Sequence, residues 1–310
     1  MAAAPRFGLA LSGGGARGLA HIGVLAVLQE EGLIPELIVG SSIGAVIGAA
    51  FALQPDAAVL KEAAMRVFAP GGTASSVLRR LKQNKPAAGI REGVLERIGD
   101  FAAKEYLLNL TLLRGSLLSE REVRECLSGL VPDLTFSDLR IPFAATAVDL
   151  VQGRRVILNE GSLHRAVMAS SALPGLMPPV AYRGMLLADG AMLEAVPAAA
   201  ARELGAETVV GVDVGSRLES PVCLRDGIDV LQRATEIMML HLRAAGRRAC
   251  DVLIEPELGP FHWTDFASVA EMIAAGARAS RARLPALQNA LRQGRWSSAI
   301  RRLRRRLSRG

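Results

Sequence analysis

The sequence predicts an α/β fold built around a mostly parallel central β-sheet. Short apolar runs, typical of buried strands, alternate with longer runs of helical periodicity, and short loops join them. A glycine-rich turn directly follows each of the first two apolar runs. Half of the 310 residues are hydrophobic and only 4% are aromatic, which predicts a large aliphatic core. Strands that alternate with helices pair in parallel through right-handed crossovers.

The individual elements follow from the apolar runs and from the residues that break them. Gly32 and Pro35, for example, end the first helical run. The apolar stretch over residues 37–53 is at the short limit for crossing a bilayer and is interrupted by glycines and serines, so a buried strand and helix explain it better. The expected strands cover residues 7–11, 37–39, 139–148, 154–158, 185–188, 208–214 and 252–255. The expected helices cover residues 18–30, 43–53, 162–170, 197–204 and 226–248.

A pentapeptide with the pattern G-x-S-x-G, from Gly40 to Gly44, lies between the second strand and the second helix. This context is typical of a nucleophile elbow, a strained turn that presents the hydroxyl of Ser42 at the carboxyl edge of the sheet. Gly40 and Gly44 lack a Cβ, so strand and helix can pack closely around the turn. The helix N-terminus favours negative charge developing beside Ser42. The pentapeptide alone is equally compatible with an ordinary glycine-rich turn.

A glycine-rich loop with the sequence GGGARG, residues 13–18, follows the first strand. Consecutive glycine amides at a helix start form an anion-binding nest. A dinucleotide site would need an acid at the end of the second strand, where this chain has glycine and serines, and no Walker A lysine is present. The other anion is the tetrahedral oxyanion that Ser42 would generate. The predicted oxyanion donors are the amides of Gly13, Gly14 and Gly15, with Gly18 supporting the loop.

The base for Ser42 is predicted to be Asp189, which ends a strand at Asp189-Gly190-Ala191. A histidine in the chain order of an α/β-hydrolase would be His241 or His262, but neither follows a strand in a glycine-rich loop, and His241 lies on an expected packing face of a helix. Only 41 residues precede the elbow, too few for the strands that precede it in that fold. A Ser–Asp dyad is therefore favoured, with Gly190 supporting the turn.

Four further polar residues lie close to these motifs. Arg17 is expected either to order the glycine loop or to face a lipid phosphate, and it is equally compatible with a surface arginine at a helix start. His21 is expected to be a packed or capping histidine. Asp149 and Asp213, each near a strand end, are expected to make structural hydrogen bonds.

The three motifs together resemble the patatin-like phospholipases, of the bacterial type related to neuropathy target esterase. GGGARG, GSSIG and DGA stand in that family's order, and the segments IPFAATAVDLVQGRRVILNEG and AVMASSALPGLMPPV resemble its intervening blocks. The resemblance covers residues 6–215. It implies a three-layer α/β/α sandwich, a Ser42–Asp189 dyad, an oxyanion site at Gly13 to Gly15, ester-lipid substrates, and no metal or organic cofactor.

One residue departs from the family pattern. The family often carries an asparagine shortly before the proline that follows the DGA, and this chain has Glu194 before Pro197. Glu194 is either solvated or faces Asp189. In the second case, two neighbouring carboxylates would raise one pKa and weaken the base.

The C-terminal residues 291–310 form a basic tail. Eight arginines and no acid lie between residue 292 and the end, and the rest of the chain has 29 basic against 30 acidic residues. A narrow apolar stripe within the arginines is typical of a helix that lies on an anionic membrane, but a helix packed on the body is equally compatible. No aromatic-interleaved patch favours nucleic acid. The stripe consists of Trp296, Ile300, Leu303 and Leu307.

The chain is expected to form one catalytic domain with additions. Residues 1–215 form the catalytic part, with a helical lid or insertion over about 54–135, and residues 216–290 complete the domain with helices. The three cysteines are widely spaced, so a disulfide framework is not expected, and no signal peptide is visible. These features predict a cytoplasmic protein, peripheral on the inner membrane face if the tail binds lipid.

The expected activity is hydrolysis of carboxylic esters of phospholipids or lysophospholipids through an acyl-enzyme on Ser42. The alternative is a catalytically weak protein that keeps the fold and acts as a lipid-surface or regulatory scaffold. Labelling by a serine-reactive phosphonate distinguishes the two, since a scaffold need not activate Ser42.

Overall fold

The computed structural model describes residues 7–69, 71–74, 116–215, 218, 224, 227–259, 261, 263–266 and 268–307. In these residues an eight-stranded sheet has the order β5-β6-β3-β2-β1-β7-β8, and β4 also pairs with β3. The strands are β1 (Phe7–Leu11), β2 (Leu37–Ser41), β3 (Phe143–Asp149), β4 (Arg154–Leu158), β5 (Val180–Tyr182), β6 (Met185–Asp189), β7 (Thr208–Val212) and β8 (Val252–Ile254). The α-helices are α1 (Ala20–Glu30), α2 (Ile43–Leu53), α3 (Ala57–Phe68), α6 (Glu120–Ser128), α7 (Leu163–Ser170), α8 (Ala198–Glu203), α9 (Gly227–Arg248) and α10 (Val269–Leu307).

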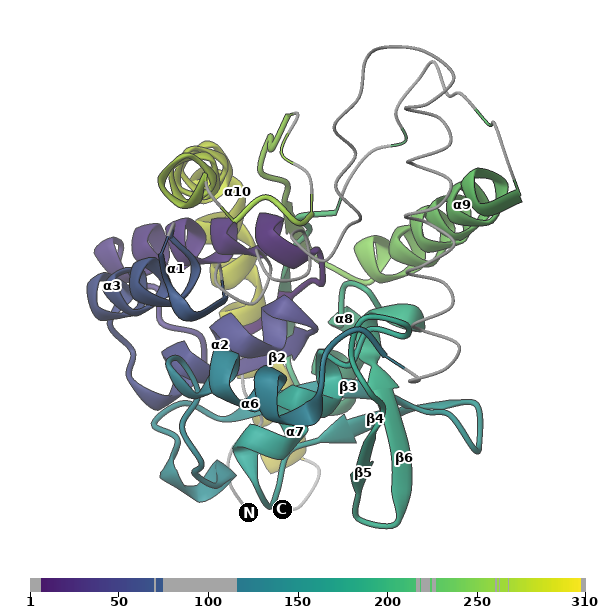
Figure 1. The fold of residues 1–310 in the computed structure, drawn as a ribbon. Coiled ribbons are helices and arrows are strands. Elements are labelled where there is room, and N and C mark those ends of the chain that lie inside the picture. Colours follow the sequence, from purple (N-terminus) through teal and green to yellow (C-terminus); the bar gives the residue numbers. More distant parts are fainter. Residues whose placement is uncertain are drawn as a thin grey trace, which may run out of the picture.

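Helices cover both faces of the sheet, which confirms the predicted α/β fold. Figure 1 shows α1, α2, α3 and α10 grouped on one side of the molecule and α8 and α9 on the other. Alternation along the strands explains the two layers: Leu9 and Leu11 of β1 belong to the larger apolar core, while Ala10 between them belongs to a second cluster with α8. The pairs β1–β2, β1–β7, β2–β3 and β7–β8 are parallel.

Several element bounds differ from the predicted ones. The strand expected from residue 139 begins at Phe143, because the amides of Arg140 and Ile141 donate instead to the carbonyl of Ala52 at the end of α2. The short strand β5 was not expected, and it forms an antiparallel hairpin with β6. The 3-10 helix η1 (Gly15–Leu19) precedes α1. The expected insertion over residues 54–135 contains α3 and α6, and its residues 70 and 75–115 lie outside the described residues.

Two strands of opposite direction end against the same edge of β3. Along one edge of β3, residues 145–149 pair with β4. Some of these same residues also pair with β2 and others with β6. Because a residue pairs with only one strand on each side, β2 and β6 must both lie on the other edge of β3. On that edge Ser41 of β2 pairs with Thr146, and Asp189 of β6 pairs with Ala147, the next residue. Because β2 is parallel and β6 antiparallel to β3, the carboxyl ends of β2 and β6 meet.

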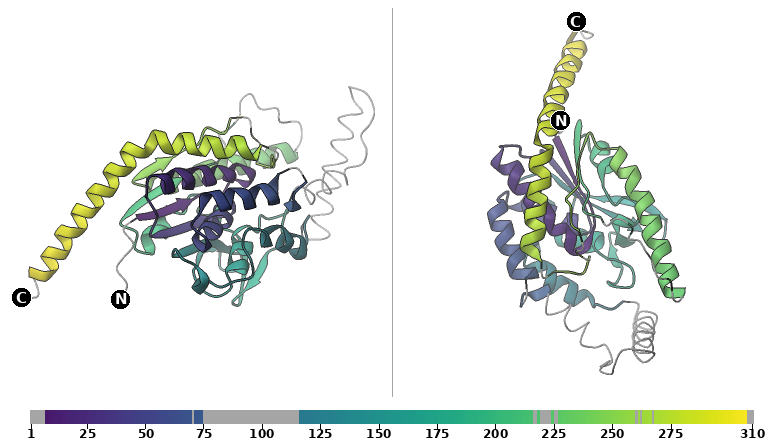
Figure 2. Two further views of the ribbon diagram at one scale, coloured as in Figure 1. Left: turned by 90° about the vertical axis from the view of Figure 1, so that its left-hand side faces the viewer. Right: turned by 90° about the horizontal axis from the view of Figure 1, so that it is seen from above.

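The two longest helices extend in opposite directions. Figure 2, in the view from above, shows α9 reaching forward along one side and the C-terminal part of α10 extending backward beyond the body. Gly294 of α10 lies against the side chain of Thr208, the first residue of β7, so the helix beyond Gly294 leaves the molecule at the amino edge of the sheet. Among the described residues, no helix is both long enough and apolar enough to cross a membrane.

Candidate active site

Ser42 occupies the turn between β2 and α2 with φ 54° and ψ −127°. Among the described non-glycine residues, only Ser42 and Arg183 have a positive φ. The predicted strained turn is thus present. A Cβ on Gly40 would lie 2.4 Å from Cα of Ala45, and one on Gly44 would lie 2.2 Å from the carbonyl oxygen of Leu11, so both positions require glycine.

The Ser42 hydroxyl donates a hydrogen bond to Oδ2 of Asp189 at 2.6 Å. The other carboxylate oxygen, Oδ1, accepts the amide of Ala191 at 2.8 Å, which fixes the carboxylate plane. Both residues are in reach of each other because their strands end at neighbouring positions on β3. Gly190 is required at this turn, since a Cβ there would lie 2.2 Å from the carbonyl oxygen of Thr146.

Asp189 is an unusual carboxylate because it is buried and, among the described residues, forms no ion pair with a cation. Burial raises its pKa from 3.8 to about 6, and the hydrogen bonds from Ser42 and Ala191 oppose that rise. A carboxyl group with a raised pKa is a stronger base than an ordinary aspartate. The site can therefore accept a proton from a hydroxyl held in hydrogen-bond contact.

The elbow is also held by two serines of the α7 region that belong to none of the three sequence motifs. The Ser42 amide donates to Oγ of Ser170 at 3.0 Å, and the hydroxyl of Ser171 donates to the Ser42 carbonyl at 3.4 Å. Both lie in the segment AVMASSALPGLMPPV, which resembles a family block but carries no recognisable catalytic pattern. Only the fold brings them 128 and 129 residues back to Ser42.

The glycine loop lies directly against Ser42. A Cβ on Gly13 would stand 3.2 Å from that of Ser42 and 2.9 Å from that of Ala191. The amide of Gly13 donates to the carbonyl of Ala195 at 3.0 Å, so the prediction that it is an oxyanion donor is corrected. Among the described residues, the amides of Gly14 and Gly15 have no acceptor.

The rest of the loop is fixed by close packing and by Arg17. Gly15 has φ 58°, and a Cβ there would lie 2.4 Å from the carbonyl oxygen of Trp263. Gly18 allows η1 to touch Ile43 at the start of α2. The guanidinium of Arg17 is buried and donates to three carbonyls, so it orders the loop, and the interpretation as a surface arginine is wrong. The acceptors are Val214 at 2.8 Å, Phe261 at 3.0 Å and Gly215 at 3.2 Å.

None of the three described histidines bonds to Ser42 or Asp189. His21 is fully buried and donates from Nε2 to the Ser12 carbonyl at 2.9 Å, as a packed histidine would, and burial lowers its pKa to about 4. His241 was expected on a packing face of its helix but is exposed, because α9 turns that side outward. His262 lies outside the described residues.

Asp149 and Asp213 have the structural roles expected of them. Oδ1 of Asp149 accepts the amides of Val151 and Gln152 and closes the turn between β3 and β4. Oδ1 of Asp213 accepts the amide of Gly215, and its Oδ2 contacts Arg243 and Arg247 of α9.

Glu194 is neither solvated nor directed at Asp189, so both sequence interpretations are wrong. Its Oε1 accepts the amides of Ala199 and Ala200 in the first turn of α8, and its Oε2 bonds to Arg155 of β4 at 2.5 Å. A carboxylate at a helix N-terminus is stabilised by the helix dipole. The sequence could not indicate this role because it depends on β4 and α8 meeting at the loop after Asp189.

The basic tail forms the end of one continuous helix. α10 runs without a break from Val269 to Leu307, although the tail was expected to begin at residue 291. Its backbone leaves the sheet at the amino edge, the end opposite to Ser42. The side chains beyond Gly294, and with them the predicted apolar stripe, lie outside the described residues.

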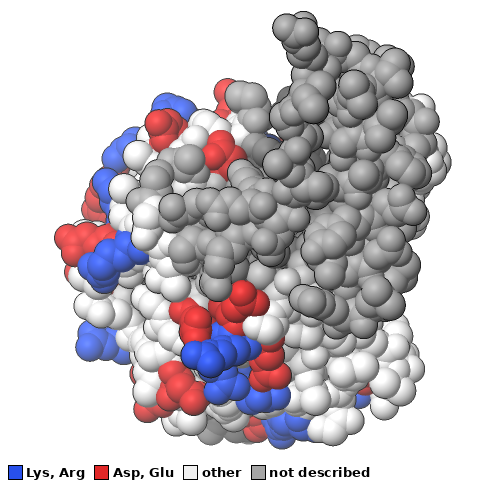
Figure 3. All heavy atoms as spheres, in the orientation of Figure 1, with Lys and Arg blue, Asp and Glu red and all other residues white. Residues whose placement is uncertain are grey.

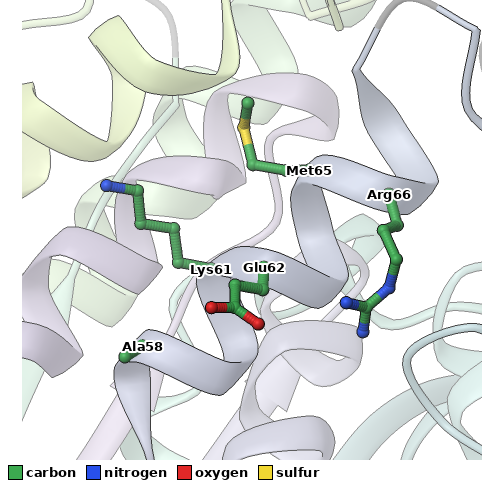
Figure 4. A pocket seen from close by; sticks show the side chains of 5 residues that line it. All are labelled: Ala58, Lys61, Glu62, Met65 and Arg66. Carbon is green, nitrogen blue, oxygen red and sulfur yellow. The ribbon is translucent and has the colours of Figure 1, made fainter.

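Other surface features lie away from Ser42. Figure 4 shows a pocket whose described lining side chains all come from one helix, α3. Its lining residues are Ala58, Lys61, Glu62, Met65 and Arg66. Acidic and basic side chains are interspersed on the described surface in Figure 3. Among the described residues, no group of three His, Cys, Asp or Glu residues is placed to hold a metal ion.

Sequence comparisons with known proteins identify one family. A family model described as patatin-like phospholipase matches residues 9–202. The chain is 34% identical over 214 residues to human patatin-like phospholipase domain-containing protein 6, a match that covers 68% of this chain and 14% of that protein. It is 33% identical over 217 residues to an uncharacterized NTE family protein of Mycobacterium tuberculosis, covering 70% of this chain and 51% of that protein. The crystal structure of VipD from Legionella pneumophila is similar in fold, with a TM-score of 0.50 and 16% identity over 93% of this chain and 68% of that one.

Proposed function

This chain belongs to the patatin-like phospholipase family, and from that premise we propose that it hydrolyses carboxylic esters of phospholipids or lysophospholipids through a covalent acyl-enzyme. Ser42 is the nucleophile and Asp189 is the base. The chain spans 14% of the length of its mammalian relatives and 51% of the mycobacterial one. The proposal therefore rests on the site of this chain and not on the activity of those longer proteins.

The observation that carries the proposal is the 2.6 Å hydrogen bond between the Ser42 hydroxyl and Asp189, at a turn with a positive φ. A serine that only capped a helix would need neither the strained backbone nor a buried carboxylate as acceptor. The family and the lipid-related names of its members support an ester lipid as substrate.

In the first half of the reaction, Oγ of Ser42 attacks the acyl carbonyl carbon while Asp189 takes the hydroxyl proton. The carbonyl oxygen becomes an oxyanion beside the glycine loop. The amides of Gly14 and Gly15 are its proposed donors, and the N-terminus of α2 adds a favourable dipole. The protonated Asp189 then gives its proton to the leaving alcohol, and the ester C–O bond breaks.

In the second half, water attacks the acyl-enzyme with Asp189 again as base, which releases the fatty acid and restores Ser42. A carboxylate with a pKa of about 6 is a weak base compared with the imidazole–carboxylate pair of a triad. Esters, whose alkoxides leave more readily than amines, are therefore the substrates this dyad suits.

The decisive experiment is labelling with a fluorophosphonate that carries a long acyl chain. We expect the unaltered protein to gain one adduct on Ser42 by mass spectrometry, and Ser42→Ala to gain none. Asp189→Asn should label far more slowly, because the hydroxyl loses its base. Ser128→Ala, which removes an exposed serine of α6 that bonds only to its own helix, is the matched control and should label normally. Absence of labelling in the unaltered protein would favour the scaffold alternative.

The tail is proposed to tether the enzyme to anionic lipid through its arginines. A variant that ends at Gly294 keeps the part of α10 that packs on β7 and removes seven of the eight tail arginines. It should bind vesicles rich in phosphatidylglycerol much more weakly than the full chain does at low salt. Equal binding of the two proteins would discard the tether.

A further inference from the structure

The outer side of α9 is apolar, which is the reverse of an ordinary surface helix. At about 100° per residue, the exposed apolar residues between Val230 and Ala245 fall in a stripe roughly 140° wide, and His241 is the one polar residue within it. All of them are exposed, including Leu231 at 67% and Met238 at 57%. This outer stripe consists of Val230, Leu231, Ala234, Ile237, Met238, Leu242 and Ala245.

The opposite side of α9 faces the body and carries the polar contacts. Arg243 is buried and bonds to Asp213, and Gly246 lies so close to the carbonyl of Val196 that a Cβ would stand 2.4 Å from it. Because Arg243 and Gly246 fix the inner side, the exposure of the stripe is set by how the helix packs and not by a free rotation of α9.

The stripe also lies at the active-site end of the molecule. Arg243 packs against Gly215, just beyond the carboxyl end of β7, and Cys250 packs against Gly211 within β7. Residues 227–242, about 24 Å of helix at 1.5 Å per residue, therefore extend away from the carboxyl edge of the sheet. Ser42 stands at this same edge, at the end of β2. Figure 2 shows α9 reaching forward in this way.

We propose that the outer stripe of α9 docks the enzyme on the surface of a neutral phospholipid bilayer or micelle, so that Ser42 faces the lipid it hydrolyses. The proposal rests on the function proposed above. An amphipathic helix binds at such an interface by burying its apolar face about 5–10 Å deep between the headgroups.

Charge favours a neutral lipid surface over an anionic one. The stripe holds no charged residue, and the flanking Arg233 and Glu236 pair with each other at 3.3 Å. Area disfavours a second copy of the chain. One helix stripe offers on the order of 500 Å², so a symmetric pair would bury about 1,000 Å², below the roughly 1,200–2,000 Å² of stable interfaces.

The test measures binding to vesicles of pure phosphatidylcholine at high salt, where the basic tail has no anionic partner. All proteins carry Ser42→Ala, so that the lipid is not consumed. The triple variant Val230→Ser, Leu231→Ser, Met238→Ser should lower the partition coefficient at least tenfold. The control Val59→Ser, Ile34→Ser, Met65→Ser removes similar exposed side chains from α3 and from the loop before β2, and should bind as the parent does.

Insertion is measured separately by tryptophan fluorescence. Brominated phosphatidylcholine should quench the fluorescence of Met238→Trp more than that of the parent, whereas the fluorescence of Met65→Trp should be quenched no more than that of the parent. Unchanged partition of the α9 triple variant, or quenching of Met238→Trp no greater than that of Met65→Trp, overturns the proposal. So does a dimeric parent that the triple variant turns into a monomer in the absence of lipid, because the stripe is then the interface between two copies.

Failure of the docking proposal is distinguishable from failure of the proposed function. With Ser42 restored, hydrolysis of a water-soluble short-chain ester should be the same in the α9 triple variant and the parent. If the parent hydrolyses this ester but the α9 triple variant binds vesicles as well as the parent does, only the docking proposal is contradicted. A parent that binds through the stripe but hydrolyses no ester contradicts the hydrolase alone.

Discussion

The amide of Gly13 and the carbonyl of Ala195 are joined by a 3.0 Å hydrogen bond, which ties the glycine loop after β1 to the loop that follows Asp189. The proposed oxyanion donors and the proposed base thus lie on two loops that are hydrogen-bonded to each other. This bond removes Gly13 from the proposed donors and leaves the amides of Gly14 and Gly15, which have no acceptor among the described residues.

Replacing Gly15 by alanine should lower kcat by about 100- to 1,000-fold, the usual loss when an oxyanion donor is displaced. The new Cβ would collide with the Trp263 carbonyl and move the loop. Gly153→Ala is the matched control, since Gly153 has a similar φ of 64° but open space around it. Both changes should cost about 1–2 kcal/mol of folding stability from the left-handed backbone. An equal loss of kcat in both variants would show that the collision at Gly15 is irrelevant.

The pH dependence of kcat/KM should report the buried base. Because only the carboxylate form of Asp189 accepts a proton, kcat/KM should rise with pH through about 6 and then level off. An ordinary aspartate would place this rise near pH 4. Hydrolysis of a soluble ester over a range of pH measures it, and a rise complete below about pH 5 would contradict burial as the controlling factor.

Asp189→Asn should abolish turnover and at the same time stabilise the protein at alkaline pH. The raised pKa means that the native state holds the Asp189 proton more tightly than the unfolded chain does. Its contribution to stability is therefore full below pH 3.8 and is lost as pH rises through about 6. At about pH 8 the loss is of order 3 kcal/mol, from roughly 1.4 kcal/mol per pKa unit.

The asparagine variant has no such titration. We expect its gain in unfolding free energy over the parent to be larger at about pH 8 than at about pH 4 by a few kcal/mol. Denaturant unfolding at both pH values, together with ester hydrolysis, measures this. A gain in unfolding free energy that is the same at both pH values would mean that burial does not raise the pKa of Asp189.

Ser170→Ala should weaken the elbow without touching the substrate. The variant leaves the Ser42 amide without its acceptor, at a cost of about 1–3 kcal/mol in stability. A positioning role predicts that kcat falls while KM and the pH profile stay unchanged, and that Ser170→Thr restores part of kcat. Reduced stability with full kcat would leave Ser170 with a purely structural role.

Glu194→Asn should not raise activity at neutral pH, because Glu194 does not face Asp189. It should instead destabilise the protein by about 1–3 kcal/mol, since Arg155 and the first turn of α8 lose a buried partner. Glu203→Gln removes the other, more exposed carboxylate that Arg155 contacts and should change stability by less than about 1 kcal/mol. A higher rate of ester hydrolysis by Glu194→Asn at neutral pH would instead support interference between the carboxylates of Glu194 and Asp189.

The turn at Ser42, the strand that ends at Asp189 and the strand–helix core could be predicted from the sequence because each depends on local pattern. The elbow at Ser42 is a contiguous pentapeptide, and the strand before Asp189 is a contiguous apolar run. Arg17 and Glu194 could not be assigned, because their partners lie on distant segments that only the fold brings close. The antiparallel direction of β6 could not be predicted either, because an apolar run does not indicate whether its strand will pair in parallel or antiparallel.

Because β2 and β6 meet on one edge of β3, that strand sets the distance between Ser42 and Asp189. Ser42 and Asp189 are 147 residues apart in the chain, yet their spacing is set by one step along β3, from Thr146 to Ala147. Loops between them can lengthen or shorten without moving either group. One residue inserted between Thr146 and Ala147 would move Ser42 and Asp189 about 3.3 Å further apart, beyond hydrogen-bond reach.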